Sequence, residues 1–311
     1  MKAVKQILLI VILPLMLIGG INYAIDPDYT LRKNHIPHLT DELVKGNCIS
    51  GPVNINSREL KRQWIEKLPS LPNVLALGSS RTLALSHKTF PNETFFNASV
   101  TNCTFQDMYS FVYLIENKWG KLPENIIICV DQWLLGNNFK EKQWLVNRSS
   151  FIEMVKRTNC NKGFKIPSRW ELDKEWIKEL FSVKYLARSI KLRGQSEEFR
   201  VSNTWEINTS STFMPDGSRI LPNNIVNANE NEVNKKAVEY FYSSNDERFN
   251  TLDPGQCQLL ECLINYLEAK GCKIELFIPP YHPLTYQRYQ QSAETKGIFE
   301  AEFFIKQNFK N

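Results

Sequence analysis

Four short, almost continuous apolar runs divide the chain, and polar or turn-forming residues bound each of them. They predict strands over residues 73–77, 94–98, 125–130 and 273–278. Uninterrupted runs such as NIIICV over 125–130 are typical of strands buried on both faces, which is the pattern of a parallel sheet.

Helical periodicity lies between these runs. Large apolar residues recur every three or four positions in 105–118, at Met108, Phe111, Val112 and Ile115. A second helix is predicted after Asp253, with a proline at its first position and Gly271 at its end. Strands and helices in alternation predict an α/β fold, with three layers around a mostly parallel sheet.

The connection between the third and fourth strands, over about 136–250, is far longer than an ordinary loop and predicts an insertion or cap. One clear helix in it begins with a Ser168–Glu171 capping box, and its polar stretch 224–236 is expected to be a flexible return. Its tryptophans are Trp144, Trp170, Trp176 and Trp205. The predicted segments are an N-terminal helix (1–25), a connector (26–70), the first part of the α/β domain (71–136), the insertion (137–250) and the second part of the α/β domain (251–311).

The N-terminus carries the longest apolar run. Residues 7–25 contain no charged side chain and follow Lys2 and Lys5, so the run is long enough to span a bilayer with the basic residues held inside. A cleaved signal peptide is the alternative, but no Ala-x-Ala-like cleavage site follows the run. We therefore predict a retained signal anchor, a single transmembrane helix, with the rest of the chain outside the cytoplasm.

Composition and charge argue against several classes of protein. With 42% hydrophobic residues among 311, the chain can bury a large core. Its net charge of +5 is spread without a dense Lys/Arg block, which argues against a nucleic-acid partner. No predicted strand is followed by a Gly-x-Gly-x-x-Gly or Walker-type loop, which argues against a bound nucleotide.

Cysteine and histidine spacing predicts no metal site. The seven cysteines form no Cys-x-x-Cys pair, and Cys129 and Cys262 resemble small buried apolar residues, although an exported protein has room for one disulfide. Pro37 lies between His35 and His38 and spoils a helical ligand pair. We predict neither a metal nor a cofactor.

The stretch VLALGSSRT (74–82) places a glycine and two serines directly after the first strand. In an open α/β sheet, the residues after neighbouring strands converge at one edge, where ligands bind. A serine there, beside the N–H groups of a helix start, can help to hold a developing oxyanion, which points to acyl transfer. The residues predicted to line this crevice are Gly78, Ser79, Ser80, Arg81, Asn97, Asn102, Asp131, Gln132 and Trp133.

Each of these residues also has a purely structural interpretation. Ser79 or Ser80 can be a helix N-cap, and Gly78 can serve only the tight turn. Asn97 taken alone is typical of a turn, and Gln132 of a solvated loop. The convergence of three strand ends favours a functional site.

VLALGSSRT resembles the first block of the SGNH (GDSL-type) hydrolase superfamily, in the Gly-Ser-Ser-Arg form of membrane-anchored bacterial envelope proteins. That branch includes the D-alanyl transfer protein of teichoic acid modification and relatives of the alginate acetylation proteins. Four further segments are similar to that branch and occur in the same order, namely NYAIDPD, FFNASVTNCTFQD, IIICVDQWL and LFIPPYHP.

This resemblance implies roles for individual residues. Ser80 takes the nucleophile position, and its N–H, the N–H of Asn102 and the side-chain amide of Gln132 form the oxyanion hole. Asn102 stands where the family usually has glycine. Arg81 marks the branch and is not a catalytic residue of it.

The family's Asp-x-x-His block, which supplies the acid and the base, is absent, so the resemblance implies a truncated or frameshifted member with little or no activity. A serine nucleophile needs a base within hydrogen-bond reach. His282 is the one histidine at the carboxyl end of a predicted strand and is the candidate base, with a structural or substrate-contact role as the alternative. His87 is expected about two turns into the helix after the corner, pointing away from the N-terminus of that helix.

The leading hypothesis is an acyl-ester hydrolase or acyltransferase, anchored in the bacterial inner membrane, that acts on an envelope glycan or acylated polymer beside a membrane acyltransferase partner. The alternative is a non-catalytic envelope protein, whose crevice and Trp-rich insertion bind a glycan or a protein.

Overall fold

The computed structural model describes residues 2–26, 31, 36–51, 55–160, 166, 168–191, 200–203 and 210–309, without the side chains of 2–9, 169, 172 and 175. The helices are α1 (Lys2–Ile25), α2 (Ile36–Val44), α3 (Ser57–Lys67), α4 (Phe105–Trp119), α5 (Arg148–Thr158), α6 (Arg169–Leu180), α7 (Val183–Lys191), α8 (Asn223–Val226), α9 (Glu230–Ser243), α10 (Pro254–Ala269), α11 (Pro283–Gln291) and α12 (Lys296–Asn308). The strands are β1 (Cys48–Ser50), β2 (Val74–Leu77), β3 (Phe95–Asn97), β4 (Asn125–Cys129), β5 (Arg200–Ser202), β6 (Thr212–Phe213), β7 (Arg219–Ile220) and β8 (Lys273–Phe277).

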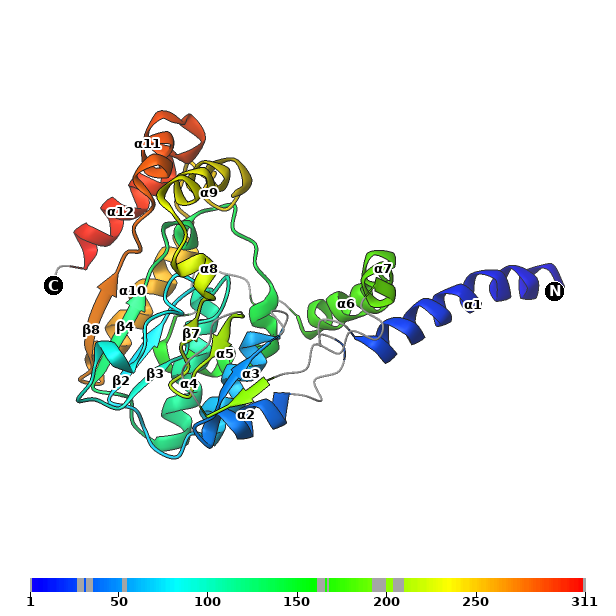
Figure 1. Cartoon of the computed structure of the whole chain (residues 1–311), viewed down its shortest axis with the longest axis horizontal. Coiled ribbons are helices and arrows are strands. Elements are labelled where there is room, and N and C mark those ends of the chain that lie inside the picture. The colour runs from blue at the N-terminus through cyan, green and yellow to red at the C-terminus, as the bar shows by residue number, and fades with distance from the viewer. Residues whose placement is uncertain are drawn as a thin grey trace.

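A parallel sheet in the order β3-β2-β4-β8 forms the centre of the fold (Figure 1), which confirms the predicted α/β class and all four predicted strands. Counted along the chain, the strand order is 2-1-3-4, so the direction of winding reverses between β2 and β4. In such sheets the crevice outside the strand ends at the reversal is the usual ligand site. The corner after β2 and the loop after β4 lie on its two sides.

The two faces of this sheet are covered unequally. One face joins the main core, where Leu75 and Ile126 pack with helix residues such as Met108 of α4 and Leu263 of α10. The other face has a small cluster formed by Val74, Ala76, Phe95 and Ile127, against which Leu85 and Phe90 pack. The predicted helical layer is therefore found on the first face, whereas the segment after the corner covers the second.

The prediction that all four strands are buried on both faces is wrong for β8. This strand pairs only with β4 and lies at the edge of the sheet, with Phe277 43% exposed. Its residues alternate: Ile274 and Leu276 are half-buried against the main core, whereas Lys273, Glu275 and Phe277 on the other face are exposed.

A second, antiparallel sheet in the order β5-β1-β6-β7 was not predicted. Its strand β1 belongs to the predicted connector (26–70), and β5, β6 and β7 belong to the predicted insertion (137–250). Lys61 of α3 holds its β6–β7 turn against the parallel sheet, because its Nζ donates hydrogen bonds to the carbonyls of Asn97 and Gly217. Complete burial lowers the pKa of Lys61 to about 7.

Residues 137–250 are divided among several places in the fold. Helix α5 packs on α4, and Trp144 is buried beside it. The expected flexible return is wrong, since residues 224–236 fall largely in α8 and α9, and α9 begins with a capping box of Asn229 and Glu232. Helix α6 begins at Ser168 as predicted, but the Ser168 side chain makes no capping hydrogen bond. Trp205 lies outside the described residues.

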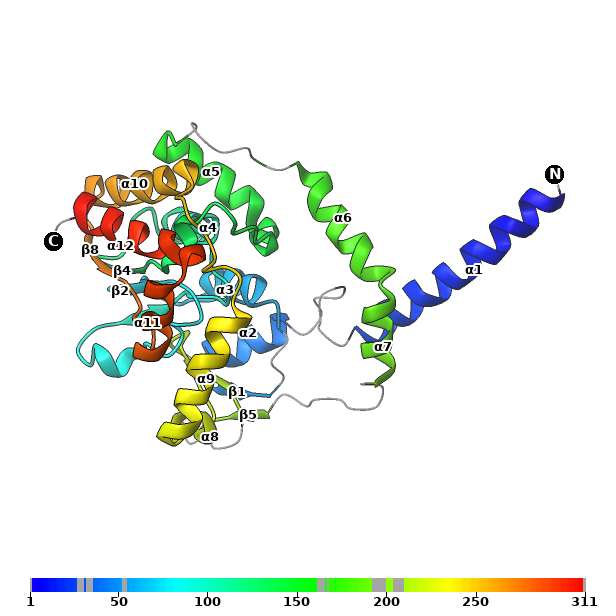
Figure 2. The ribbon, with the colours of Figure 1, turned by 90° about the horizontal axis from the view of Figure 1, so that it is seen from above.

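Helix α1 lies beside α6 and α7 at one end of the molecule (Figures 1 and 2). Its contact with them is polar: the side-chain amide of Asn22, fully buried, donates to the carbonyls of Leu180 (2.9 Å) and Ser182 (3.0 Å) where α6 ends. Among the described residues, no helix combines the length and apolar character needed to cross a membrane, so the predicted transmembrane helix is not found there.

All seven cysteines are free thiols. Cys129 is buried, as predicted, whereas Cys262 is partly exposed.

Candidate functional site

The corner after β2 is a pair of tight turns and not the start of a helix. The N–H of Thr82 donates to the Ser79 carbonyl (3.1 Å), and the N–H of Leu85 donates to the Thr82 carbonyl (2.9 Å). A short 3₁₀ helix, His87–Thr89, follows. The prediction that places His87 two turns into a helix is therefore wrong.

Gly78 is required by close packing where β2 ends. A Cβ atom at this position would lie 2.6 Å from the Cβ of Cys129 on β4, which real Cβ atoms do not tolerate. The main chain can therefore turn here only without a side chain.

Replacing Gly78 by alanine should destabilise the protein by about 1–3 kcal/mol, because the added methyl group overpacks the junction between β2 and β4. Thermal unfolding followed by circular dichroism in detergent measures this. The matched control is Gly20→Ala, where a Cβ would meet nothing within 4 Å, and its unfolding midpoint should be unchanged. Equal midpoints for the two variants would contradict the packing argument.

The SGNH resemblance assigns two main-chain donors, the N–H groups of Ser80 and Asn102, to the oxyanion hole. Ser80 and Asn102 are both exposed, and neither N–H donates a hydrogen bond to any described residue. The Ser80 hydroxyl has no partner among the described residues either. Asn102 has a φ of +50°, in the left-handed region that favours glycine and that asparagine adopts more readily than most residues.

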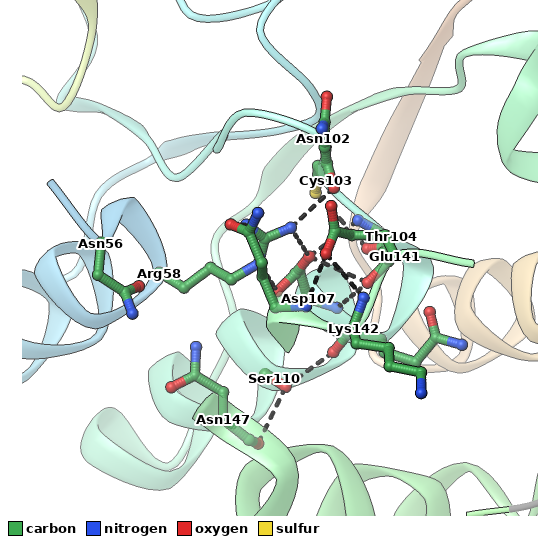
Figure 3. Close-up of polar contacts among 12 residues, drawn as sticks. Asn56, Arg58, Asn102, Cys103, Thr104, Asp107, Ser110, Glu141, Lys142 and Asn147 are labelled. Carbon is green, nitrogen blue, oxygen red and sulfur yellow. Dashed lines mark hydrogen bonds and ion pairs between the residues drawn. The ribbon is translucent and has the colours of Figure 1, made fainter. Parts of the chain in front are cut away.

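A buried ion pair holds the loop that carries Asn102 (Figure 3). Arg58 of α3 pairs with Asp107 of α4 through two parallel contacts of 2.9 and 3.0 Å, and both side chains are almost completely buried. The same guanidinium donates to the main-chain carbonyl of Asn102 (2.7 Å). Asp107 also accepts from Thr104, closing the capping box that begins α4. The sequence prediction missed this pair.

Arg81, next to the serine corner, is the centre of a second buried ionic cluster. Its Nη1 lies 3.0 Å from Asp131 Oδ1, at the end of β4, and its Nη2 lies 3.1 Å from Glu247 Oε1. Both carboxylates are fully buried. Tyr240 accepts from Arg81 (2.7 Å) and donates to Glu247, while the ring of Tyr281 stacks on the guanidinium at 4.6 Å.

The charges of this cluster do not balance. Burial raises the pKa of Asp131 above its ordinary value, and the Arg81 guanidinium only partly offsets this effect. Burial also raises the pKa of Tyr281. With two carboxylates around one guanidinium, Arg81 has no charge left for an anion, so the cluster favours an uncharged or cationic group beside it.

Four predicted crevice residues are occupied by other contacts. Asn97 is fully buried and donates to the carbonyls of Thr82 and Leu85, which closes the corner. The Gln132 side chain donates to Glu302 of α12 (3.0 Å), so its amide N–H is directed to that helix. Trp133 belongs to the main core. Ser79 is buried, with its hydroxyl accepting from the N–H of Arg81 (3.2 Å).

His282 lies beside Arg81 on the wall of a cavity of about 720 Å³. Its Nδ1 accepts from the N–H of Leu284 (3.2 Å), which makes His282 the N-cap of α11. Apolar and aromatic side chains of α8, α9 and the segment before α11 form most of the wall. The residues that matter here are Arg81, Ile225, Val233, Tyr240, Tyr281 and His282.

A histidine–carboxylate pair lies on the other side of the corner. His87 Nδ1 is 2.8 Å from Asp216 Oδ2 in the β6–β7 turn, and the His87 N–H donates to the same oxygen. This contact ties the segment after the serine corner to the antiparallel sheet. The two residues are separated by 129 positions in the chain, so no local sequence pattern indicates the pair.

No known protein family, curated protein or solved structure matches the chain.

Proposed function

We propose that this protein is a membrane-anchored, SGNH-like acyl-ester hydrolase or acyltransferase that acts on a glycan or acylated polymer of the bacterial cell envelope. Ser80 attacks the acyl carbon and gives its hydroxyl proton to a base, for which His282 is the candidate, while the N–H groups of Ser80 and Asn102 stabilise the oxyanion. The ester's alcohol leaves with a proton as the oxyanion collapses to an acyl-enzyme, and water or an acceptor hydroxyl then takes the acyl group. The observation that carries the proposal is that these two N–H groups have no acceptor among the described residues.

The cavity beside Arg81 suits an acyl ester. Its walls are mostly apolar and include the rings of Tyr240 and Tyr281, which offer contact area to an acyl chain or a sugar face. Asp131 and Glu247 already neutralise Arg81, so the site favours an uncharged ester over a phosphate. The side-chain amide of Gln132 is not part of this scheme, because it is bound to Glu302.

The membrane anchor in the proposal is supported by the charge-free run of residues 7–25 after Lys2 and Lys5. A chain anchored in this way at the bacterial inner membrane holds its α/β domain outside the cytoplasm, where envelope polymers and a membrane acyltransferase partner are found.

A fluorophosphonate probe tests the proposed nucleophile directly. The detergent-solubilised protein should form an adduct on the peptide that contains Ser80, and Ser80→Ala should abolish the adduct. Ser79→Ala is the matched control, since Ser79 is buried, and it should still be labelled. An unlabelled wild-type protein beside a labelled control esterase would contradict the acyl-transfer proposal.

The base can be assigned with a variant that preserves the fold. His282→Asn keeps a good N-cap for α11 but removes the imidazole. Loss of labelling in this variant would assign the base to His282, whereas unchanged labelling would direct the search to His87 and Asp216.

A non-catalytic envelope protein that binds a glycan or a partner protein is the second candidate. One observation favours it: none of the histidines described by the structure forms a hydrogen bond with Ser80, and the Nδ1 of His282 is already used as a helix cap.

A further inference from the structure

The α6–α7 hairpin exposes large apolar side chains in stripes. On α6, Trp170 and Ile177 are 64% and 39% exposed, and Phe181, the residue after α6, is 39% exposed; Trp176 of α6, 40% exposed, lies off their face. On α7, Val183 and Ile190 are 67% and 58% exposed. Separations of seven, four and seven residues place each set on one face of its helix. The exposure is therefore an organised surface, unlike the scattered apolar residues of an ordinary protein surface.

The opposite side of α7 fixes the hairpin to α1. Tyr185 is buried and donates to Asp26 Oδ1 (2.6 Å), and Ser189 donates to Asn22 Oδ1 (3.3 Å). Phe181 also lies against Gly19, where a Cβ atom would approach its ring to 3.0 Å. The stripe on α7 therefore faces outwards because the polar positions of α7 face α1, whereas Phe181 belongs to the contact with α1 and not to the outward face.

The apolar surface continues along α1. Between Ile10 and Leu17, seven large apolar side chains are between 41% and 72% exposed, namely Ile10, Val11, Ile12, Leu13, Leu15, Met16 and Leu17. Figures 1 and 2 show α1, α6 and α7 side by side and apart from the α/β body. The hairpin lies at the C-terminal end of α1, where an anchor helix leaves the bilayer.

Basic residues border this surface. Helix α7 contains Lys184, Arg188 and Lys191 and no acidic residue. An apolar stripe flanked by basic residues is typical of a helix that lies in the interface of an anionic membrane, and tryptophan is enriched at that depth.

We propose that the α6–α7 hairpin lies in the headgroup region of an anionic bilayer, beside the point where α1 enters it. This inference rests on the proposed membrane anchor. The occupant of the stripes is lipid, because they lie beside the exposed apolar helix α1 and because α7 carries positive charge that anionic lipids attract, although α6 itself has four acidic and three basic residues. The hairpin then fixes the orientation of α1 at the membrane surface.

Tryptophan quenching by lipid tests the hairpin separately from the anchor. The full chain is reconstituted in vesicles of brominated phosphatidylcholine with phosphatidylglycerol, and flotation first establishes that it is bound. Bromine quenches tryptophans in contact with the acyl chains. Trp170→Phe should remove the largest single share of the quenched emission, whereas Trp119→Phe, the matched control at the end of α4, should leave it unchanged.

The possible results are distinct. If the protein floats with the vesicles but Trp170→Phe leaves the quenched emission unchanged, the hairpin proposal is overturned while the anchor stands. If the protein does not float, the anchor itself is refuted and the hairpin proposal with it. Quenching that is lost with Trp170→Phe supports the hairpin as an interfacial element.

Discussion

Replacing Arg81 by methionine should destabilise the protein by about 3–5 kcal/mol, the usual effect of removing one partner from a buried ion pair. The substitution leaves Asp131 and Glu247 buried without the cation that both contact. A loss of this size is a large part of a domain's total stability, so unfolding at a much lower denaturant concentration is the expected measurement.

The stability of the Arg81→Met variant should also depend on pH, in a direction that follows from the pKa of Asp131. Burial raises the pKa of Asp131 in the folded protein, and without Arg81 that pKa should rise further. A carboxyl group with a raised pKa favours folding below its unfolded-state pKa, and this stabilisation is lost as the pH rises through its folded-state pKa. The variant should therefore lose stability from mildly acidic to neutral pH more steeply than the wild type.

Two further variants separate charge from packing. Arg81→Met combined with Asp131→Asn and Glu247→Gln removes all three charges of the Arg81 cluster and should recover much of the lost stability. Arg157→Met is the matched control, since its partner Glu116 keeps Lys270 at 2.9 Å, and it should cost less than about 1 kcal/mol. A triple variant no more stable than Arg81→Met would show that the loss comes from packing.

The sequence predicts the parallel sheet because its strands are continuous apolar runs, and it predicts which strand ends meet because parallel strands share an edge. It does not predict β1, β5, β6 and β7, whose two or three residues are too short to show any alternation. Helix α9 was missed for another reason: its sequence is polar, and its first turn is set by a cap and not by an apolar stripe.

The candidate site could likewise be predicted from the sequence only in part. Local chemistry pointed to Gly78 and Ser80, since a glycine and a hydroxyl after a strand can be recognised in one short stretch. The partners that hold the site cannot be recognised in this way: Glu247 is 166 residues from Arg81. A charged side chain in a sequence carries no sign of its distant counterion, so burial and pairing are visible only in the structure.

Arg58→Met is the second substitution with a large expected effect, again about 3–5 kcal/mol, because it leaves the carboxylate of Asp107 buried beside Thr104 without its cation. Arg62→Met is a close control one turn further along α3. Arg62 is 31% exposed and pairs with the exposed Glu66 and the buried Glu59, and Glu59 keeps a donor in the Gln63 side-chain amide (2.8 Å), so the loss of Arg62 should cost less than the loss of Arg58. Urea unfolding of both variants measures the difference, and equal stability would show that the buried pair contributes nothing.

The Arg58 variant also tests the link from this pair to the chemistry. Without Arg58, the main-chain carbonyl of Asn102 loses its donor, and the left-handed turn that presents the Asn102 N–H is held less firmly. At a temperature where the variant is still folded, fluorophosphonate labelling of Ser80 should therefore be slower than in Arg62→Met. Equal labelling rates with unequal stabilities would mean that Asn102 supplies no oxyanion donor. The pair would then stabilise α3 and α4 without positioning the site.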